Sequence, residues 1–359
     1  MGAAPEPTTW PQVLSTLTSG GDLPAGHAAW AMDQVMSGSA SPVQLTAFLI
    51  SHFAKGPTSA EVREMADVML DHAMTLDVGT TEVVDLVGTG GDGALSVNIS
   101  TMAALVVAGL GIPVIKHGNR ASTSACGSAD VLAHLGVDLA DSPREVAKIF
   151  AATGMGFCFA NVFHPAMRHV APVRRELGVP TVFNVLGPLT NPARPRAGAV
   201  GCAREYFAPI MAGVYASRGQ DVMVFRARNG LDELTTAAVN DIWFATGGRV
   251  ERYELDAVAD LGLRPWTVAD LRGGDPSVNA GVMRALLENA DDASPAVHET
   301  VLLNAAAAVV AFGTLPGTRA QDGDLVERMR AAYALAQEAL SAGKALAVLE
   351  NWVRLSQES

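Results

Sequence analysis

The sequence contains few cysteines and few aromatic residues. Its cysteines, Cys126, Cys158 and Cys202, are too few and too scattered for a disulfide framework or a paired-cysteine metal site. Aromatic residues make up only 6% of the chain, although hydrophobic residues make up 49%. The apolar content is therefore mostly alanine, valine and leucine, which favours closely packed helices over a β-sandwich. The cysteine usage predicts a cytoplasmic protein.

Basic residues are also scarce. The chain has 25 lysines and arginines against 37 acidic residues, which gives a formal net charge of −12. Such a surface repels nucleic acids and anionic membranes, so we expect neither as a partner. An anionic ligand must therefore be bound in a local pocket or together with a metal ion.

The sequence shows neither a signal peptide nor a clear membrane span. Residues 1–11 are polar and rich in proline, without a charged start and an apolar stretch. The longest apolar run, residues 99–115, is interrupted by Ser100, Thr101, Gly109, Gly111 and Pro113. It predicts a buried helix followed by a buried strand.

At 359 residues the chain is long enough for two domains. Apolar residues recur at helical spacing in four early stretches, 10–17, 24–36, 42–54 and 59–74. From Val83 the pattern changes to alternating strands and helices, which indicates an α/β domain. The strands are predicted at VVDLVG, IPVIKHG, MGFCFA, AGAVGCA, DVMVFRA and DIWFAT. Further helices are predicted at 162–177, 279–289, 297–312 and 324–350, and a linker near 76–81.

The most informative stretch runs from Val83 to Arg120. The glycines of GTGGDG, which follow a predicted strand, leave room for a ligand to approach the backbone. The NIST sequence at 98–101 is placed where a helix begins, with free N–H groups that favour an anion. A simple helix cap explains NIST equally well. KHGNR at 116–120 follows the next strand, and ligands of open α/β sheets bind at such strand ends. We therefore predict one site for a polyanion.

Two common nucleotide motifs do not fit the glycine loop. A dinucleotide fingerprint needs an acidic residue about 20 positions further on, and none occurs near Ala108. A P-loop needs a Lys-Ser or Lys-Thr pair, which is also absent. Phosphate or diphosphate binding remains the best interpretation of GTGGDG.

Two further groups of charged residues have alternative interpretations. His164, Arg168 and Arg175 in HPAMRHVAPVRR recur at helical spacing until Pro172 interrupts it. They form either a solvated basic face or a carboxylate clamp, since arginine binds carboxylate in a planar fork. The adjacent acids of GLDEL, at 232–233, are either solvated surface or ligands for Mg²⁺ beside a diphosphate.

The motifs together resemble those of the anthranilate phosphoribosyltransferase family. The likeness runs nearly end to end, in the family's order and spacing, through GTGGDG, NIST, KHGNR with GSADVL, HPAMRHVAPVRRELGVPTVFNVLGPLTNP, GLDELTT, DLRGGDPSVNA and LLNAA. It implies a small all-helical domain, 1–78, joined in space by a segment near 162–190. It also implies a large α/β catalytic domain, 79–359, with a mixed, mostly parallel sheet flanked by helices.

The resemblance also implies a function, transfer of phosphoribose from phosphoribosyl pyrophosphate to the amine of anthranilate in tryptophan biosynthesis. It implies a homodimer formed through the helical domain and two Mg²⁺ ions held by Ser100, Asp232 and Glu233. Anthranilate would contact Gly88, Asn119, His164, Arg174 and Pro188. The donor would contact Gly88, Gly91, Asp92, Ser96, Asn98, Ile99, Ser100, Thr101, Lys116, His117, Gly118, Asn119, Arg120, Ala121, Ser122, Thr123, Ser124 and Ser128.

The departures from the family pattern are small. Ser96 stands where threonine is common, Ala125-Cys126 replaces a more polar pair, and His52-Phe53 lies outside the expected site. No obligatory general base stands out, and His117 is only the nearest candidate. A pyrimidine nucleoside phosphorylase and a non-catalytic nucleic-acid-binding relative are the alternatives. The acid pair at 232–233 and the Arg174 segment favour the transferase over both, and the net charge argues against the second.

Overall fold

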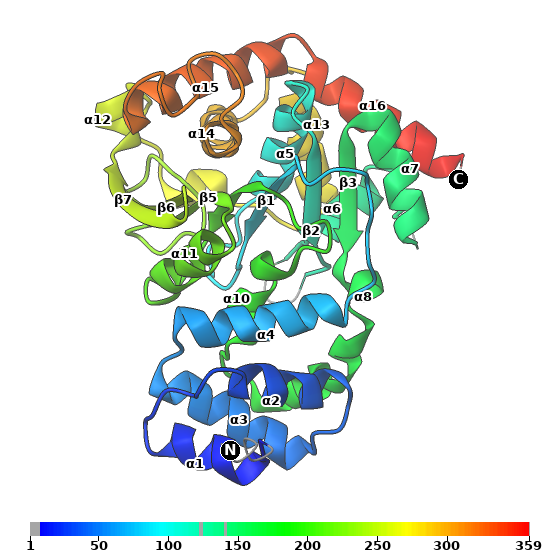
Figure 1. The fold of residues 1–359 in the computed structure, drawn as a ribbon. Coiled ribbons are helices and arrows are strands. Elements are labelled where there is room, and N and C mark those ends of the chain that lie inside the picture. The colour runs from blue at the N-terminus through cyan, green and yellow to red at the C-terminus, as the bar shows by residue number, and fades with distance from the viewer. Residues whose placement is uncertain (1–7, 122–124, 140–141, 359) are drawn as a thin grey trace.

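The computed structural model describes residues 8–121, 125–139 and 142–358. A helical bundle lies at one end of the molecule and a sheet covered by helices at the other (Figure 1). The bundle consists of α1 (Trp10–Thr18), α2 (His27–Met36), α3 (Pro42–Lys55) and α4 (Ser59–Asp71). Ser41 and Thr58 cap α3 and α4, since each side chain accepts a hydrogen bond from a backbone N–H of the first turn. All four helices were predicted from the sequence.

A seven-stranded sheet forms the centre of the larger part, in the order β3-β2-β1-β4-β5-β6-β7. Strands β1 to β5 pair in parallel, whereas β6 and β7 pair antiparallel. The predicted fold class, a mixed and mostly parallel sheet with a helical part, is confirmed. The strands are β1 (Val84–Gly88), β2 (Val114–Gly118), β3 (Met155–Phe159), β4 (Ala197–Gly201), β5 (Asp221–Ala227), β6 (Asn240–Thr246) and β7 (Arg249–Leu255).

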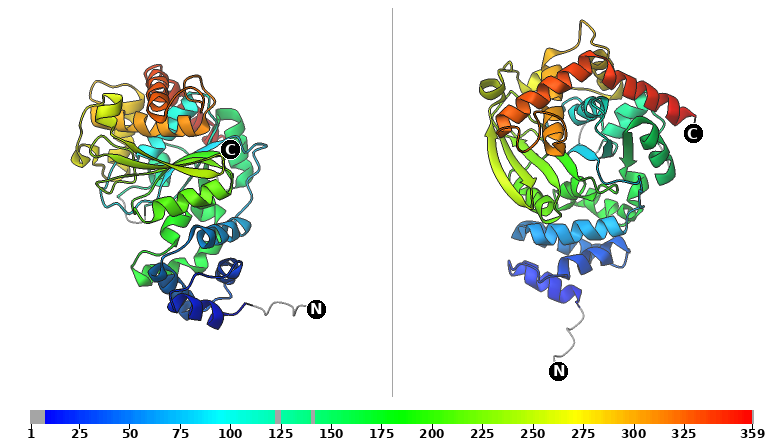
Figure 2. Two further views of the ribbon diagram at one scale, coloured as in Figure 1. Left: turned by 60° about the vertical axis from the view of Figure 1, so that its left-hand side comes forward. Right: turned by 45° about the horizontal axis from the view of Figure 1, so that its top comes forward.

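Helices cover both faces of the sheet (Figure 2). On one face α5 (Ile99–Gly109) and α14 (Pro295–Phe312) pack against the central strands, with α15 (Leu325–Ser341) and α16 (Lys344–Gln357) outside them. On the other face α11 (Phe207–Ser217) packs against β5 and β6. The apolar core under α11 continues into the bundle, because Phe207 and Val224 belong to the same buried cluster as Phe48.

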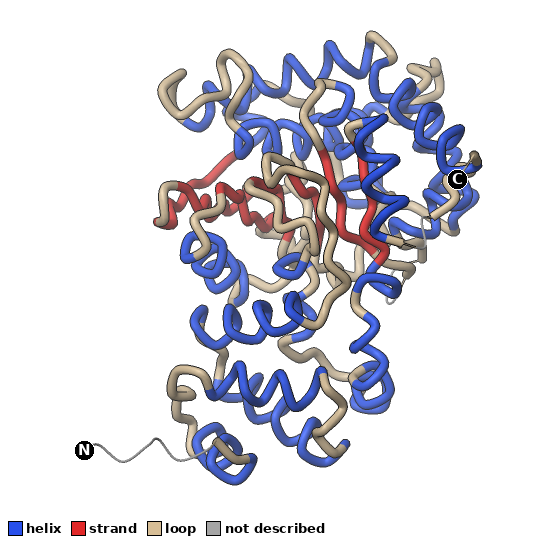
Figure 3. The backbone as a smooth tube through the Cα atoms, turned by 45° about the vertical axis from the view of Figure 1, so that its right-hand side comes forward, coloured by secondary structure: helices blue, strands red, loops and turns tan. Residues whose placement is uncertain are grey.

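The tube in Figure 3 shows the strands gathered in the centre and helices on either side. The remaining helices of the large part are α6 (Ser128–His134), α7 (Pro143–Thr153), α12 (Ala257–Leu261), η3 (Val268–Leu271) and α13 (Pro276–Leu287). Helix α14 is long and apolar enough to cross a membrane by length and composition alone, but 83% of it is buried inside the protein. It is the central helix of the larger core.

The prediction of one helix over 162–177 is wrong. The segment forms three short pieces, α8 (Ala160–Phe163), η1 (Pro165–His169) and α9 (Ala171–Leu177). Pro165 and Pro172 explain the interruptions, because proline lacks an N–H and restricts the residue before it. The segment continues into α10 (Phe183–Leu186) and η2 (Pro188–Thr190), which pack against α4.

Two other predictions need correction. The stretch 324–350 is not one helix, because the chain turns at Gly343, whose φ of 72° is left-handed, between α15 and α16. Strand β7 was not predicted at all. Its residues alternate in exposure at the sheet edge, and the Gly247-Gly248 pair before it is a typical hairpin turn that could have revealed it.

Candidate active site

The glycine loop follows the end of β1 and packs against an acidic residue from a distant segment. The Gly90 N–H donates a hydrogen bond to Asp232 Oδ2 at 2.6 Å. At Gly88 a Cβ atom would lie 2.4 Å from the same oxygen, so no side chain fits there. Gly90 and Gly91 have φ angles of 67° and 82°, a conformation that favours glycine. The loop therefore needs glycine for its own turn and for its contact with Asp232.

Helix α5 begins at the same edge of the sheet. Asn98 is its N-cap residue, and Ser100 and Thr101 lie in its first turn. The Asn98 side chain makes no capping hydrogen bond. The Ile99 and Thr101 N–H groups already donate to the Val97 and Asn98 carbonyls. The turn therefore offers an anion the partial positive charge of the helix start and the Thr101 hydroxyl, which has no hydrogen-bond partner among the described residues.

Lys116 lies at the end of β2 and is 1% exposed. Its ammonium group donates hydrogen bonds to the Leu86 carbonyl and to Ser100 Oγ, the second at 3.1 Å. Burial lowers the pKa of Lys116, and the nearby Asp85 and Glu233 carboxylates oppose that shift. The lysine thus links the start of α5 to the acidic side of the site.

Asp85 was missed by the sequence analysis. It is 3% exposed, and its carboxylate accepts hydrogen bonds from the His117 N–H and the Asn191 amide. Burial raises its pKa to about 6, against the attraction of Lys116. An acidic residue inside the otherwise apolar strand VVDLVG was the signal that could have found it, because buried acids are rare without partners.

Three acidic side chains meet beside the glycine loop. Burial and the Asp92 charge raise the pKa of Asp232 to about 7. Burial and the Asp232 charge raise the pKa of Glu233 well above its usual range. Asp92 Oδ2 is buried and has no hydrogen-bond partner among the described residues. Buried acids in this arrangement are stabilised by a cation.

The fit of this cluster to Mg²⁺ follows from its chemistry. Within the described parts of the chain, no three His, Cys, Asp or Glu side chains are already arranged as a complete metal site. Mg²⁺ does not require one, because it is usually held by one or two carboxylates together with substrate phosphates. The residues present therefore fit a magnesium ion that binds with a phosphorylated ligand.

A cavity of about 460 Å³ joins these groups. Most of the predicted donor residues line it, as do both acids predicted for the metal. Ala121 is not among its lining residues, and Ser122, Thr123 and Ser124 lie outside the described residues. The predicted residues that line the cavity are Gly88, Gly91, Asp92, Ser96, Asn98, Ile99, Ser100, Thr101, Lys116, His117, Gly118, Asn119, Arg120, Ser128, Asp232 and Glu233.

The side chain of Arg120 already has a partner at this site. It donates to Asp130 Oδ1 at 3.0 Å and lies over the ring of Phe159. The Asp130 carboxylate also accepts from the Ala121 and Gly127 N–H groups. Asp130 therefore holds the loop after β2 against the start of α6.

Two histidines lie side by side at the edge of the cavity, with their ring centroids 5.0 Å apart. His117 Nδ1 donates to the Gly187 carbonyl at 3.0 Å, and His164 Nε2 donates to the Thr190 carbonyl at 3.0 Å. His117 Nε2 is buried and has no partner in the described structure, so it is an available acceptor. Burial and the neighbouring His164 lower the pKa of His117 to about 3.

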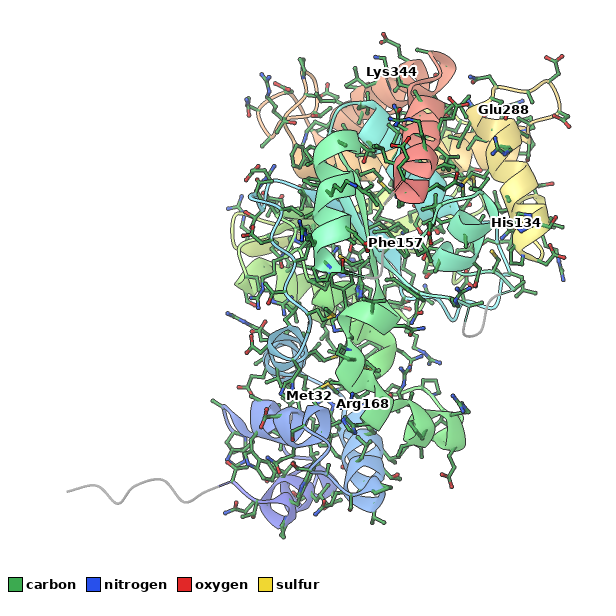
Figure 4. All side chains as sticks on the ribbon, turned by 90° about the vertical axis from the view of Figure 1, so that its right-hand side faces the viewer. Met32, His134, Phe157, Arg168, Glu288 and Lys344 are labelled. Atoms are coloured by element: carbon green, nitrogen blue, oxygen red, sulfur yellow. The ribbon has the colours of Figure 1, made fainter. Side chains whose placement is uncertain are left out.

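Arg174 on α9 has an unusual environment for an arginine. Burial lowers its pKa, and its guanidinium carbon lies 5.4 Å from the ring centre of Phe183. No acidic partner is found for it among the described residues. Arg168 is exposed, and Figure 4 shows it at the level of the helical bundle, well below Phe157 of β3. Arg174, rather than Arg168 or the exposed Arg175, is the arginine suited to hold a carboxylate.

Pro188 does not line the donor cavity. It is buried in η2, its carbonyl accepts a hydrogen bond from the Tyr215 hydroxyl at 2.8 Å, and it borders a second cavity of about 530 Å³. That cavity lies between α4 and the sheet and contains Arg63, Arg194 and Arg218. All three arginines are paired with Asp67 or Asp71.

Comparison with known proteins places this architecture in a family. Residues 80–346 match the glycosyl transferase family a/b domain, and residues 11–73 match its helical bundle domain. An anthranilate phosphoribosyltransferase from Salinispora arenicola is 51% identical over 351 residues, which covers 97% of each chain. One from Mycolicibacterium smegmatis is 50% identical over 353 residues, covering 98% of this chain and 94% of that protein.

The chain belongs to the anthranilate phosphoribosyltransferases.

Solved structures of anthranilate phosphoribosyltransferases share the whole fold. The enzyme from Thermus thermophilus superposes with a TM-score of 0.87 at 38% identity, covering 96% of this chain and 99% of that one. The enzyme from Saccharomyces cerevisiae, in complex with PRPP and Mg, gives a TM-score of 0.85 at 25% identity, covering 98% of each chain. The predicted resemblance is confirmed.

Proposed function

We propose that this chain transfers the 5-phosphoribosyl group from phosphoribosyl pyrophosphate to the amine of anthranilate. The products are N-(5-phosphoribosyl)anthranilate and pyrophosphate, in a step of tryptophan biosynthesis. The observation that carries the proposal is the donor cavity, where a glycine loop, a helix start, a buried lysine and an acid cluster converge. A polyanion with bound metal satisfies all four features at once.

The donor is held by residues from three loops. The positive end of α5 and the Lys116 ammonium supply positive charge to its phosphates. Gly88, Gly91 and Gly118 allow its ribose and diphosphate to approach the backbone. Asn119 and Ser128 line the far side of the same cavity.

Asp232, Glu233 and the Ser100 hydroxyl hold the metal. The relative from yeast is described in complex with PRPP and Mg, which supports magnesium as the cofactor. We propose two ions, as the family resemblance implies. When bound, Mg²⁺ stabilises the charge that develops on the departing diphosphate.

Arg174 binds the carboxylate of anthranilate. Its guanidinium is partly desolvated and has no acidic partner among the described residues, so an incoming carboxylate supplies the missing counter-charge. His164 borders the acceptor's approach, and Gly88 and Asn119 meet the acceptor next to the donor, whereas Pro188 borders the second cavity and takes no part here. This arrangement brings the amine towards C1 and contributes mainly through positioning.

His117 serves better as a hydrogen-bond acceptor than as a general base. Its Nε2 atom is free to accept from the anthranilate amine. A pKa of about 3, lowered by burial and by His164, makes it a weak base at neutral pH. Catalysis therefore depends more on stabilising the departing diphosphate than on removing a proton.

The organisation of the chain is part of the proposal. Residues 1–78, with the segment near 162–190, form the small domain, and residues 79–359 form the catalytic domain. We propose that the protein is a homodimer joined through the small domain and that it works in the cytoplasm. Sedimentation of the purified protein measures its oligomeric state, and a single species of monomer mass would contradict the homodimer.

The reaction is tested by following anthranilate fluorescence after phosphoribosyl pyrophosphate is added, with and without Mg²⁺. Loss of fluorescence only with donor and metal together supports the transferase and its metal requirement. Absence of any loss with folded protein contradicts the proposal, and phosphate-dependent cleavage of pyrimidine nucleosides is then the reaction to measure.

The carboxylate clamp has its own test. Arg174→Ala should raise the anthranilate KM by about tenfold or more, with little change in the donor KM, because a charge-assisted pair is lost from one substrate only. Arg175→Ala, an exposed neighbour on the same helix, is the matched control. An equal rise in both KM values would refute the clamp.

A further inference from the structure

The segment 271–280, with the sequence LRGGDPSVNA, lies against the donor cavity but has no role in the mechanism above. Ser96 and Arg272 form an antiparallel bridge. On either side of it, the Val97 N–H donates to the Leu271 carbonyl at 3.0 Å and the Gly273 N–H donates to the Leu95 carbonyl at 2.8 Å. The segment is therefore paired with the chain that leads from the glycine loop into α5.

Asn279, in the first turns of α13, links this segment to the cavity through its side chain. It is 2% exposed and does not line the cavity. Its Oδ1 atom accepts from the Gly274 N–H at 2.8 Å, and its Nδ2 atom donates to Asn98 Oδ1 at 2.8 Å. A Cβ at Gly273 would lie 2.5 Å from that Oδ1 atom, so the turn must be glycine for the amide to fit.

The contact continues through Asn98 to a third segment. Asn98 Nδ2 donates to the Cys126 carbonyl at 3.1 Å, just before α6 begins. The two amides thus connect the turn at 273–274, the start of α5 and the loop before Ser128. Exchanging the oxygen and nitrogen of either amide would break this series of bonds.

We propose that Asn279 is a positioning residue for the phosphoribosyl donor, a role that rests on the function proposed above. By fixing the Asn98 side chain, it sets the position of the first turn of α5 and the distance of that turn from the loop before α6. The donor needs both loops at once, because its phosphates and its ribose lie in one cavity. Anthranilate, held by Arg174 on α9, does not depend on this connection.

Asn279→Asp separates this role from a merely structural one. The aspartate has the same shape and keeps an acceptor for the Gly274 N–H, but it cannot donate to Asn98. We expect the KM for phosphoribosyl pyrophosphate to rise about ten- to hundredfold, as happens when a residue that orients a binding side chain is lost. The KM for anthranilate should stay within about twofold. Calorimetric titration of phosphoribosyl pyrophosphate with Mg²⁺ should show the same loss of affinity without any turnover.

Two further variants complete the experiment. Asn279→Ala removes the side-chain amide that donates a hydrogen bond to Asn98, without adding a charge. It should also weaken the binding of phosphoribosyl pyrophosphate. Leu287→Ala, in the same helix and 0% exposed, should lower the melting temperature through lost packing but leave the donor KM unchanged. If Leu287→Ala raises the donor KM as much as Asn279→Asp, the effect is general destabilisation and the positioning role is refuted.

The two proposals fail in different ways. If the unaltered protein binds phosphoribosyl pyrophosphate with Mg²⁺ in the calorimeter but does not consume anthranilate, the proposed function is wrong. The positioning role is then still tested by the affinity of the Asn279→Asp variant for phosphoribosyl pyrophosphate. If Asn279→Asp binds the donor as tightly as the unaltered protein, the positioning role is wrong whatever the reaction.

Discussion

At the scale of single residues, a few side chains of the site have no partner of opposite charge among the described residues. Arg174 is one such residue, and the Phe183 ring beneath it is the contact that orients it. Cation–π attraction at a partly buried site contributes about 1–2 kcal/mol. Phe183→Leu should therefore raise the anthranilate KM by about fivefold to thirtyfold. Phe183→Tyr keeps an aromatic ring under Arg174, so its anthranilate KM should stay close to that of the unaltered protein. Steady-state kinetics with each substrate varied would show whether the donor KM stays constant, as the proposal requires.

Asp232 gives a prediction about pH at the same scale. Burial and Asp92 raise its pKa to about 7 from an ordinary value of 3.8, so the folded state binds the proton more tightly than the unfolded chain. Its contribution to stability is greatest below pH 4 and is lost as the pH rises towards 7. Without Mg²⁺, Asp232→Asn should thus be more stable than the unaltered protein at pH 8, by about 1–3 kcal/mol, and equal to it near pH 4.

Denaturant unfolding at the two pH values measures this difference. The same variant should lose the magnesium-dependent reaction, because a neutral amide replaces a metal-binding carboxylate. A variant that is less stable than the unaltered protein at pH 8 would show that the Asp232 carboxylate is not strained in the absence of metal.

At the scale of elements, the start of α4 depends on Glu61. This side chain is 3% exposed and accepts hydrogen bonds from Lys55 at 2.7 Å and from the Leu23 and Thr58 N–H groups, both at 2.8 Å. Burial alone would raise its pKa, but His52, Leu23 and Lys55 lower it far below the ordinary 4.5. The stability it provides is present above pH 4.5 and is lost as the pH falls below that value.

Glu61→Gln should therefore destabilise the bundle at pH 7 by about 1–3 kcal/mol, because it removes one of the two carboxylates that pair with the buried Lys55, Asp22 being the other. It should also flatten the loss of stability between pH 5 and pH 3. Thermal unfolding across that range is the measurement, with Glu64→Gln, on the same helix and outside the lysine contact, as control. An unchanged melting temperature at pH 7 would contradict this account of the helix start.

At the scale of the whole molecule, the site joins segments that lie far apart in the sequence. Binding of donor and metal should therefore stabilise the large part as a unit, by about 2.7 kcal/mol when the donor is at a hundred times its Kd. We expect phosphoribosyl pyrophosphate with Mg²⁺ to raise the melting temperature by several degrees, and either alone to raise it much less. Equal shifts without Mg²⁺ would contradict joint binding of donor and metal.

The sequence by itself predicted most of the elements and most of the residues that line the donor cavity. Strong periodicity predicted the four helices of the bundle and six of the seven strands. GTGGDG, NIST and KHGNR identified the cavity, because each stands directly after a strand or at a helix start. Ligands of open α/β sheets bind at the carboxyl ends of the strands, so no long-range information was needed. The Arg174 segment was predicted less well, since Pro165 and Pro172 break the single helix that was predicted over 162–177.

Only the tertiary structure decided which of these side chains lack partners. The structure pairs Arg120 with Asp130, whereas no acid lies beside Arg174 among the described residues. Asp85 became visible as a counter-charge of Lys116 only when β1 and β2 were side by side. Asn279 meets Asn98 across 181 residues of chain. Partners this distant are set by the packing of helices on a sheet, which no local pattern records.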